Sequence, residues 1–129
     1  MILKNPLTIR LLEGKYGICR LERNALIPEW VNKSDFLSVT RTLDELSVVC
    51  SEECIPDSIK CEKGRRILKI EGPLDFSLIG ILSSISAILA REGISIFVVS
   101  TYDTDYILVK NDDIDNATEA LKREGYRII

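Results

Sequence analysis

The sequence predicts an α+β fold built from two related units in tandem, and three observations support this prediction. Short apolar segments with strand-like alternation recur along the whole chain and are separated by turn residues. The second half adds two segments with helical periodicity. Parts of the first half also recur in the second half in the same order. A length of 129 residues allows one ordinary domain or two very small ones.

The first half contains four predicted strands, at residues 7–12, 16–21, 36–42 and 46–51. We expect the first two to form a hairpin around Gly14-Lys15. Residues 24–33 include Pro28 and are expected to be irregular or helical. Trp30 in this segment is expected to fill a core or an interface rather than to support a ligand. Residues 52–64 are polar and predict a loop with one helical turn near Pro56.

The second half predicts the element order β-α-β-β-α-β. A strand at 66–71 precedes Gly72-Pro73, and a helix at 76–91 follows with Asp75 as its N-cap and Gly93 just past its end. Strands at 94–101 and 106–110 flank the turn 102–105. A helix from residue 112 or 113 to Gly125 and a last strand at 126–129 complete the order, which is the ferredoxin-like arrangement.

Two internal matches favour a duplication. FLSVTRTLDELSVV (36–49) aligns with IFVVSTYDTDYILV (96–109) at an offset of 60 residues, which places Glu45 against Asp105. LLEG (11–14) aligns with KIEG (69–72) at an offset of 58. We therefore expect a degenerate first unit at residues 1–62, which lacks a glycine-rich loop before a regular helix, and a complete second unit at 63–129.

The composition excludes several classes of chemistry. The 17 Lys and Arg residues against 20 Asp and Glu residues leave a net charge of −3, and there is no histidine. Catalytic triads and histidine-liganded metal centres are therefore excluded. The basic residues are scattered, whereas nucleic-acid binding needs a dense positive patch. No pair of groups is positioned for acid–base or nucleophilic work, so we expect no enzymatic activity, no cofactor and no metal.

The expected location is the cytoplasm, with no membrane partner. The longest apolar run, residues 76–90, is too short to span a bilayer. The N-terminal MILKNPLTIRLLEG lacks the features of a signal peptide.

The four cysteines allow two interpretations. Three of them follow the spacing C-x3-C-x6-C, at positions 50, 54 and 61, and Cys19 lies in an apolar alternation. This spacing is not a common zinc pattern, so we expect reduced, structural thiols. A four-cysteine zinc site is the alternative.

Most of the chain resembles the ACT domain. The segment EGPLDFSLIGILSSISAILAREGISIFVVSTYDTDYILVKNDDIDNA carries the resemblance, and STYDTDYILV is its most specific part. LLEGKYGICRLE and FLSVTRTLDELSVVCSEE resemble the degenerate first unit of free-standing tandem ACT proteins. The chain also resembles half of a four-unit ACT protein that senses arginine in animals. The resemblance implies two tandem ferredoxin-like units and an amino-acid-binding regulatory role.

An amino-acid ligand needs a place for its carboxylate, and a helix N-terminus offers unpaired N–H groups. Here Asp75 is open to two interpretations, because it can cap the helix by using the same donors. The candidate residues for this part of the site are Gly72, Pro73, Leu74, Asp75, Phe76 and Ser77.

The turn between the two strands supplies the second part of the candidate site. Asp103 and Asp105 flank Thr104, and a carboxylate there can accept hydrogen bonds from an ammonium or guanidinium group. The alternative is a turn whose acids only favour the local geometry. The resemblance implies that Asp105 lies at the ligand pocket, with Tyr102 as a wall. It also places the start of the preceding strand, Ser95-Ile96, beside the ligand.

These features favour a small cytosolic amino-acid-binding regulatory module with its working site on the second unit. A homodimer would rebuild the four-unit arrangement of the arginine-sensing relatives. One alternative is a dimeric adaptor that kept the fold and lost the ligand. Another is a detached regulatory subunit of an amino-acid biosynthetic enzyme such as aspartate kinase.

Overall fold

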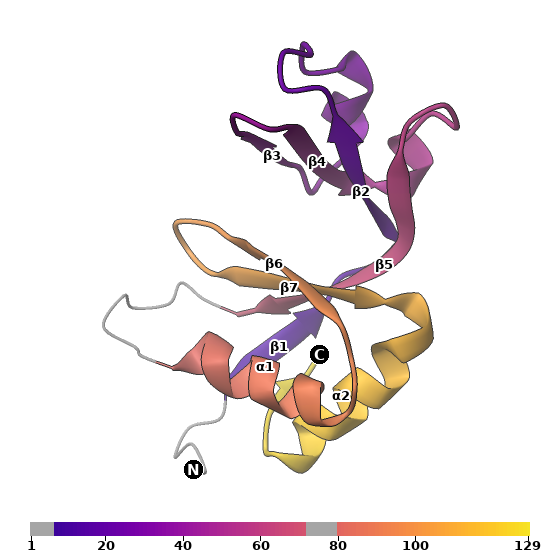
Figure 1. The fold of residues 1–129 in the computed structure, drawn as a ribbon. Coiled ribbons are helices and arrows are strands. Elements are labelled where there is room, and N and C mark those ends of the chain that lie inside the picture. The colour runs from indigo at the N-terminus through magenta and orange to yellow at the C-terminus, as the bar shows by residue number, and fades with distance from the viewer. Residues whose placement is uncertain (1–6, 72–79) are drawn as a thin grey trace. The chain divides into compact units, whose positions relative to one another are not determined.

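The computed structural model describes residues 7–71 and 80–129, which form two compact units (Figure 1). One unit is Gly14–Arg65, and the other combines the chain up to Glu13 with Arg66–Ile129. These units differ from the expected division at residues 62 and 63, because the first strand belongs with the C-terminal half of the chain. The long strand β5 (Cys61–Ile70) contributes its first five residues to one unit and the remainder to the other.

The unit Gly14–Arg65 is a four-stranded sheet with the order β3-β4-β2-β5. Its strands are β2 (Tyr16–Leu21), β3 (Ser38–Arg41), β4 (Leu46–Ser51) and the start of β5. Two short 3₁₀ helices, η1 (Glu29–Lys33) and η2 (Glu52–Cys54), occupy the places of the two α-helices. The strand order is that of a ferredoxin-like unit, and the predicted degenerate first unit is confirmed.

The sheet and the 3₁₀ helices of this unit enclose a small core. Its fully buried members include Val31 from η1, and the partly buried Trp30 packs against this core, as predicted. The buried side chains are Cys19, Val31, Leu46, Val48, Cys50 and Ile55.

The predicted loop at 52–64 is wrong at its end, because residues 61–64 belong to β5. Tyr16 is paired with Arg65 and Ile18 with Glu62, so β5 carries one extra residue between these pairs. Gly64 lies there at φ +75°, a conformation that glycine adopts without strain. Such a bulge interrupts the alternation of a strand, and this explains why the segment resembles a loop in sequence.

In its described residues, the second unit is a five-stranded sheet with two α-helices. Its strand order is β6-β7-β5-β1-β8, with β1 at Thr8–Leu11, β6 at Ile96–Ser100, β7 at Asp105–Lys110 and β8 at Arg127–Ile128. The helices α1 (Ile81–Arg91) and α2 (Ile114–Arg123) lie on the same face of this sheet (Figure 1). The 3₁₀ turn η3 (Asn111–Asp113) leads into α2. The predicted β-α-β-β-α-β order is confirmed, with β1 as an additional strand.

The predicted hairpin between β1 and β2 is wrong. β1 pairs with β5 and β8, whereas β2 pairs with β4 and β5. The long strand β5 offers a separate stretch of backbone to each of them, at Leu68–Ile70 for β1 and at Cys61–Arg65 for β2. Gly14-Lys15 is therefore a connection between two units and not a hairpin turn.

The helix α1 starts later than predicted. It begins at Ile81, and Gly80 at φ +84° is its N-cap. A residue in the left-handed region cannot continue a right-handed helix, so the predicted helix is not continuous across residue 80. Its predicted first residues, 76–79, are not among the described ones. Asp75 itself lies outside the described residues.

Both helices end in the same motif. Gly93 N–H is bonded to Ala90 O at 3.0 Å and Ile94 N–H to Leu89 O at 3.0 Å. Gly125 and Tyr126 make the matching bonds to Lys122 and Leu121 at 2.9 and 3.1 Å. These are Schellman motifs, in which a glycine at positive φ satisfies the last carbonyls of a helix. The predicted helix ends at Gly93 and Gly125 are confirmed.

The helices cover an apolar face of the sheet, and the interface is the main core of the molecule. Ile107 and Val109 of β7 contribute to it, and both are fully buried. The other buried members come from the sheet and from both helices: Ile9, Leu68, Ile70, Ile85, Ile88, Leu89, Ile94, Ile114, Ala117, Ala120, Leu121 and Tyr126.

Candidate functional site

Six of the predicted ligand-binding residues lie outside the described part of the chain. They form the segment that was expected to hold a ligand carboxylate: Gly72, Pro73, Leu74, Asp75, Phe76 and Ser77. The residues that border this segment are described. Ile70 ends β5, Glu71 follows it, and Gly80 precedes α1.

The turn between β6 and β7 is closed by two threonines. Thr101 N–H donates to Thr104 O at 2.9 Å, and the Thr101 hydroxyl donates to the same oxygen at 3.0 Å. Thr104 N–H in turn donates to Thr101 Oγ1 at 3.4 Å. The turn therefore has a defined conformation, and Asp105 begins β7 directly after it.

A buried hydrogen bond ties this turn to the end of β5. The Thr104 hydroxyl donates to Ile70 O at 2.6 Å. Thr104 is 4% exposed and is the only buried polar residue among those the structure describes. The bond fixes the turn beside the point at which the chain enters residues 72–79.

Asp105 lies on the face of the sheet that the helices cover. Side chains of a strand alternate between its two faces, and Asp105 shares its face with Ile107 and Val109. Both of these residues belong to the core beneath α1 and α2. Asp105 is half-buried, at the edge of that core. Its side chain therefore lies on the side of the sheet that α1 and α2 cover.

The other two predicted residues of the turn lie differently. Tyr102 is 83% exposed, and Asp103 is also exposed. Neither residue is part of a strand.

Within one copy of the protein, Ser95 and Ile96 lie far from Asp105. Asp105 is paired with Ser100 at one end of β6, whereas Ile96 is paired with Val109 at the other end. The two pairs are four residue steps apart along the strand, which corresponds to about 14 Å. Ile96 packs against the core, and Ser95 is exposed. A single chain therefore does not bring Ser95 and Ile96 to the Asp105 end of the hairpin.

Two residues at this end of the hairpin were missed by sequence reasoning. Ser100 lies directly opposite Asp105, and Thr101 holds the turn. Both belong to STYDTDYILV, the segment that carries the most specific part of the family resemblance. The match to this motif could have identified Ser100 and Thr101, which are its first two residues. Sequence reasoning treated them only as part of a strand.

Glu71 brings a second carboxylate to the end of β5, but this one is already paired. Its carboxylate accepts a hydrogen bond from Arg10 Nε of β1, and Lys69 Nζ lies 3.7 Å from its other oxygen. The hydrogen bond from Arg10 holds the pKa of Glu71 below its ordinary value. The charge of Glu71 is thus balanced within the protein by Arg10 and Lys69.

The unit Gly14–Arg65 contains the same turn but has no carboxylate at the position that corresponds to Asp105. Thr42 N–H donates to Glu45 O at 2.9 Å, and Thr42 Oγ1 accepts a bond from Glu45 N–H at 3.1 Å. Thr42 thus corresponds to Thr101, at an offset of 59 residues. The predicted pairing of Glu45 with Asp105 at an offset of 60 is wrong by one residue. The structural counterpart of Asp105 is Leu46, which is fully buried.

The cysteines do not form a metal site. All four are free thiols. In residues 7–71 and 80–129, no group of three or more Cys, Asp or Glu side chains is arranged to hold a metal ion. The alternative of a four-cysteine zinc site is therefore not supported.

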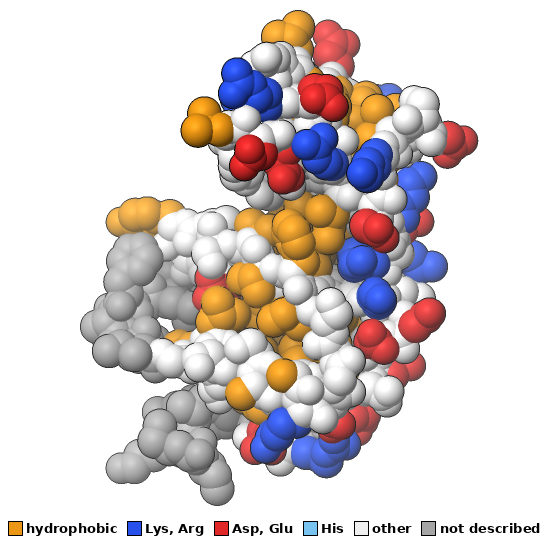
Figure 2. Space-filling view, in the orientation of Figure 1, with side chains coloured by type: hydrophobic (Ala, Val, Ile, Leu, Met, Phe, Trp, Pro, Cys, Tyr) orange, Lys and Arg blue, Asp and Glu red, His pale blue; other side chains and the backbone are white. Residues whose placement is uncertain are grey.

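Charged side chains of both signs are mixed on the face of the molecule that Figure 2 shows. There the described Lys and Arg side chains lie between Asp and Glu side chains. Within the described part of the chain, no helix is long and apolar enough to cross a membrane.

The fold and the site define a class of protein, a tandem of two ferredoxin-like units in which only the second carries a candidate site. Comparison with known families agrees with this class. The model of the ACT domain matches residues 60–123, and a model of an N-terminal domain matches residues 14–58. The chain belongs to the ACT-domain family and is a tandem ACT protein.

Solved structures extend the match over nearly the whole chain. The crystal structure of protein Atu0741 from Agobacterium tumefaciens has a TM-score of 0.91 and 38% identity, and the match covers 97% of this chain and 93% of that one. The regulatory subunit of aspartate kinase from Thermus thermophilus has a TM-score of 0.60 and 10% identity, with 92% and 94% covered. Aspartate kinase from Clostridium acetobutylicum has a TM-score of 0.65 and 16% identity, and the match covers 96% of this chain but 36% of the enzyme.

The last two similarities concern the fold alone. A search of curated protein sequences found no match.

Proposed function

We propose that this protein is a small cytoplasmic regulatory module that binds an amino acid at its second unit and has no catalytic activity of its own. The observation that carries the proposal is the Thr104–Ile70 hydrogen bond. It holds the turn that precedes Asp105 beside Ile70, the last residue of β5. The segment proposed to bind the ligand carboxylate follows two residues later in the sequence.

The chemistry of this part of the unit suits an amino acid. The half-buried Asp105 carboxylate is the acceptor for an ammonium or guanidinium group. The segment Gly72–Ser77 is the proposed binding place for the ligand carboxylate, and Tyr102 and Thr104 complete the site from the turn. The family's regulatory ACT domains and the likeness to the aspartate kinase regulatory subunit support this assignment.

Ser95 and Ile96 enter the proposed site only through a second copy of the chain. Their distance from Asp105 along β6 is about 14 Å, which is too far for one amino acid to contact both ends. A homodimer with two symmetry-related sites at its interface would supply them from the partner. The regulatory output then passes through the state of the dimer or through a further protein.

A thermal-shift panel of the twenty amino acids at millimolar concentration tests the proposal. A ligand at 100 times its Kd adds about 2.7 kcal/mol to the free energy of unfolding, which raises Tm measurably. Asp105→Asn should reduce the shift of the responding amino acid to about half or less, because a 10-fold loss of affinity leaves about 1.4 kcal/mol of the stabilisation. Asp103→Asn is the matched control, because Asp103 lies on the same turn but is exposed. No shift with any amino acid would contradict the proposal and favour a dimeric adaptor without a ligand.

A detached regulatory subunit of an amino-acid biosynthetic enzyme is the second candidate function. The match to the aspartate kinase regulatory subunit from Thermus thermophilus is nearly coextensive with both chains. This candidate predicts a stable complex with a separate catalytic chain. Size-exclusion chromatography with an aspartate kinase catalytic chain from the same source would show a shared peak if it is correct.

A further inference from the structure

Two cysteines from distant parts of the sequence lie opposite each other on adjacent strands of the unit Gly14–Arg65. Cys19 of β2 is directly opposite Cys61 of β5. The next pair along these strands is Arg20 and Lys60. Arg20 N–H donates to Lys60 O at 3.0 Å, so this is a hydrogen-bonded pair. Cys19 and Cys61 are then a non-hydrogen-bonded pair, whose Cα atoms lie about 4.5 Å apart. This separation is within the range of natural disulfides, about 4.4–6.8 Å.

The sheet leaves room for the sulfur of Cys61. Gly17 precedes Cys19 on the same face of β2, and a Cβ atom at Gly17 would lie 2.7 Å from Cys61 Sγ and 2.5 Å from Ile55 Cδ1. Any larger residue at position 17 would push Cys61 away. Glycine at this position therefore lets the two thiols approach each other.

We propose that Cys19 and Cys61 form a dithiol modification site that closes to a disulfide with a low-molecular-weight disulfide as the oxidant. The thiolate of one cysteine attacks the oxidant, forms a mixed disulfide and releases one thiolate of the reagent. The second cysteine then attacks the protein sulfur of the mixed disulfide. This step forms the protein disulfide and releases the second thiolate of the reagent. The two protein thiols lose their protons and two electrons, and the oxidant is reduced to two thiols.

The Cys19 thiol is hydrogen-bonded to both Cys50 and Cys61, and the backbone register favours Cys61 as its disulfide partner. Cys50 of β4 is paired with Gly17 and is therefore diagonal to Cys19. Diagonal Cα atoms lie about 7–8 Å apart, beyond the disulfide range. Cys50 is also fully buried, whereas Cys61 is partly exposed and is accessible to a reagent.

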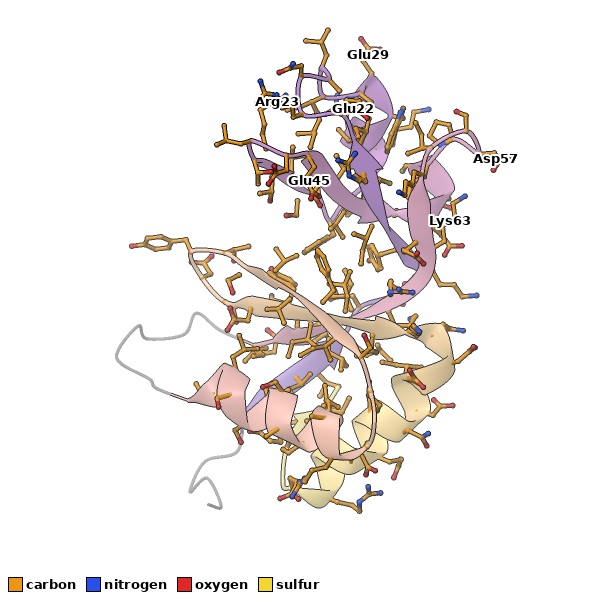
Figure 3. All side chains as sticks on the ribbon, viewed as in Figure 1. Glu22, Arg23, Glu29, Glu45, Asp57 and Lys63 are labelled. Atoms are coloured by element: carbon orange, nitrogen blue, oxygen red, sulfur yellow. The ribbon has the colours of Figure 1, made fainter. Side chains whose placement is uncertain are left out.

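The surroundings of Cys61 make the reaction slow at neutral pH. Burial and the hydrogen bond to Cys19 raise the pKa of the Cys61 thiol to about 12, with a smaller contribution from Glu62. Lys63 opposes this rise, and its ammonium group also lies 3.8 Å from Asp57 (Figure 3). Because only the thiolate attacks, the rate should rise about tenfold per pH unit between pH 7 and 9.

Tryptic peptides of the full-length protein provide a direct test. The folded protein is incubated with oxidised glutathione at pH 8.5, the remaining thiols are alkylated, and the digest is analysed without reduction. Trypsin places the two cysteines in separate short peptides, YGICR (16–20) and CEK (61–63). Cys50 and Cys54 share a third peptide, residues 42–60. We expect the linked species YGICR–CEK, and its reduction should restore both thiols.

The controls separate this disulfide from unselective oxidation. Cys54→Ser should leave the link unchanged, whereas Cys61→Ser should abolish it without a replacement link to Cys50. Protein unfolded in urea should lose the selectivity. A link between YGICR and the 42–60 peptide in the folded protein would overturn the proposal. Mixed glutathione adducts without any YGICR–CEK species would overturn it as well.

Discussion

Thr104 is the residue on which the candidate site depends. Its hydroxyl is buried and donates to Ile70 O at 2.6 Å, which connects the turn to β5. The residue is polar in an otherwise apolar interior, and no alternation or spacing in the sequence predicts the partner of its hydroxyl. This contact joins residues 34 positions apart, so it depends on the tertiary fold.

Thr104→Val keeps the shape of the side chain and removes the donor. The Ile70 carbonyl then loses this bond in a buried place, and we expect the free energy of unfolding to fall by about 1–3 kcal/mol. Urea denaturation with an unchanged m-value measures the loss. Thr118→Val is the control, since the Thr118 hydroxyl is exposed and bonds only within its own helix. A loss no larger than that of the control would show that the hydrogen bond is unimportant.

Cys61 gives the protein a dependence on alkaline pH. Its pKa is raised from 9.0 to about 12, so between these values the unfolded chain loses a proton that the folded chain keeps. The stabilisation is fully present below pH 9 and is lost as the pH rises toward 12. We expect urea unfolding to show a falling free energy from pH 8.5 to 10.5. The decline should be shallower in Cys61→Ser, and equal declines would contradict the assignment.

At the scale of elements, the two Schellman motifs explain why the helix ends were predicted well. Gly93 and Gly125 are both at positive φ, and an added Cβ at either position would meet nothing within 4 Å. The requirement for glycine is therefore purely conformational. A local requirement of this kind is visible in sequence because it depends on a single residue type.

Gly93→Ala and Gly125→Ala should each lower the free energy of unfolding by about 1–2 kcal/mol, the cost of the left-handed conformation for a residue with a Cβ. Thermal and urea denaturation measure the effect. Gly14 is also at positive φ in open space, so Gly14→Ala should cost a similar amount. Substitutions without any cost would contradict the role of these glycines.

Elements that depend on distant contacts were predicted less well. The alternation in residues 16–21 and 46–51 predicts β2 and β4 with their observed ends. The same signal does not say which strands pair, and the expected β1–β2 hairpin does not form because β5 pairs with both. Periodicity also predicted one helix that runs across Gly80, where the backbone is left-handed.

At the scale of the whole molecule, the two units share the same strand order apart from the additional strand β1. The offset between them is 59 residues in the structure, whereas the sequence alignment gave 60. The matched turns at Thr42 and Thr101 set the offset at 59 and place the buried Leu46 where the second unit has Asp105. Sequence reasoning placed the candidate site on the second unit, and this assignment and its residues stay a prediction. The packing of Thr104 and the far position of Ser95-Ile96 required the structure, because both depend on strand register.

A homodimer is the assembly that the proposed function predicts. Light scattering should give twice the 14.5 kDa mass of the chain, either at all concentrations or after addition of the responding amino acid. If Ser95 and Ile96 act from the partner, Ser95→Trp should weaken both ligand binding and dimerisation. A monomer that binds the amino acid with undiminished affinity would contradict the shared site.

The central claim is that an amino acid binds at Asp105 of the second unit, and calorimetric titration with the responding amino acid tests it most directly. The account predicts one ligand per chain for the native protein and for Asp103→Asn. It predicts a loss of affinity of about 10-fold or more for Asp105→Asn, since a charge-assisted hydrogen bond contributes about 1.5–3 kcal/mol. Equal affinity in the native protein and in Asp105→Asn would contradict the account.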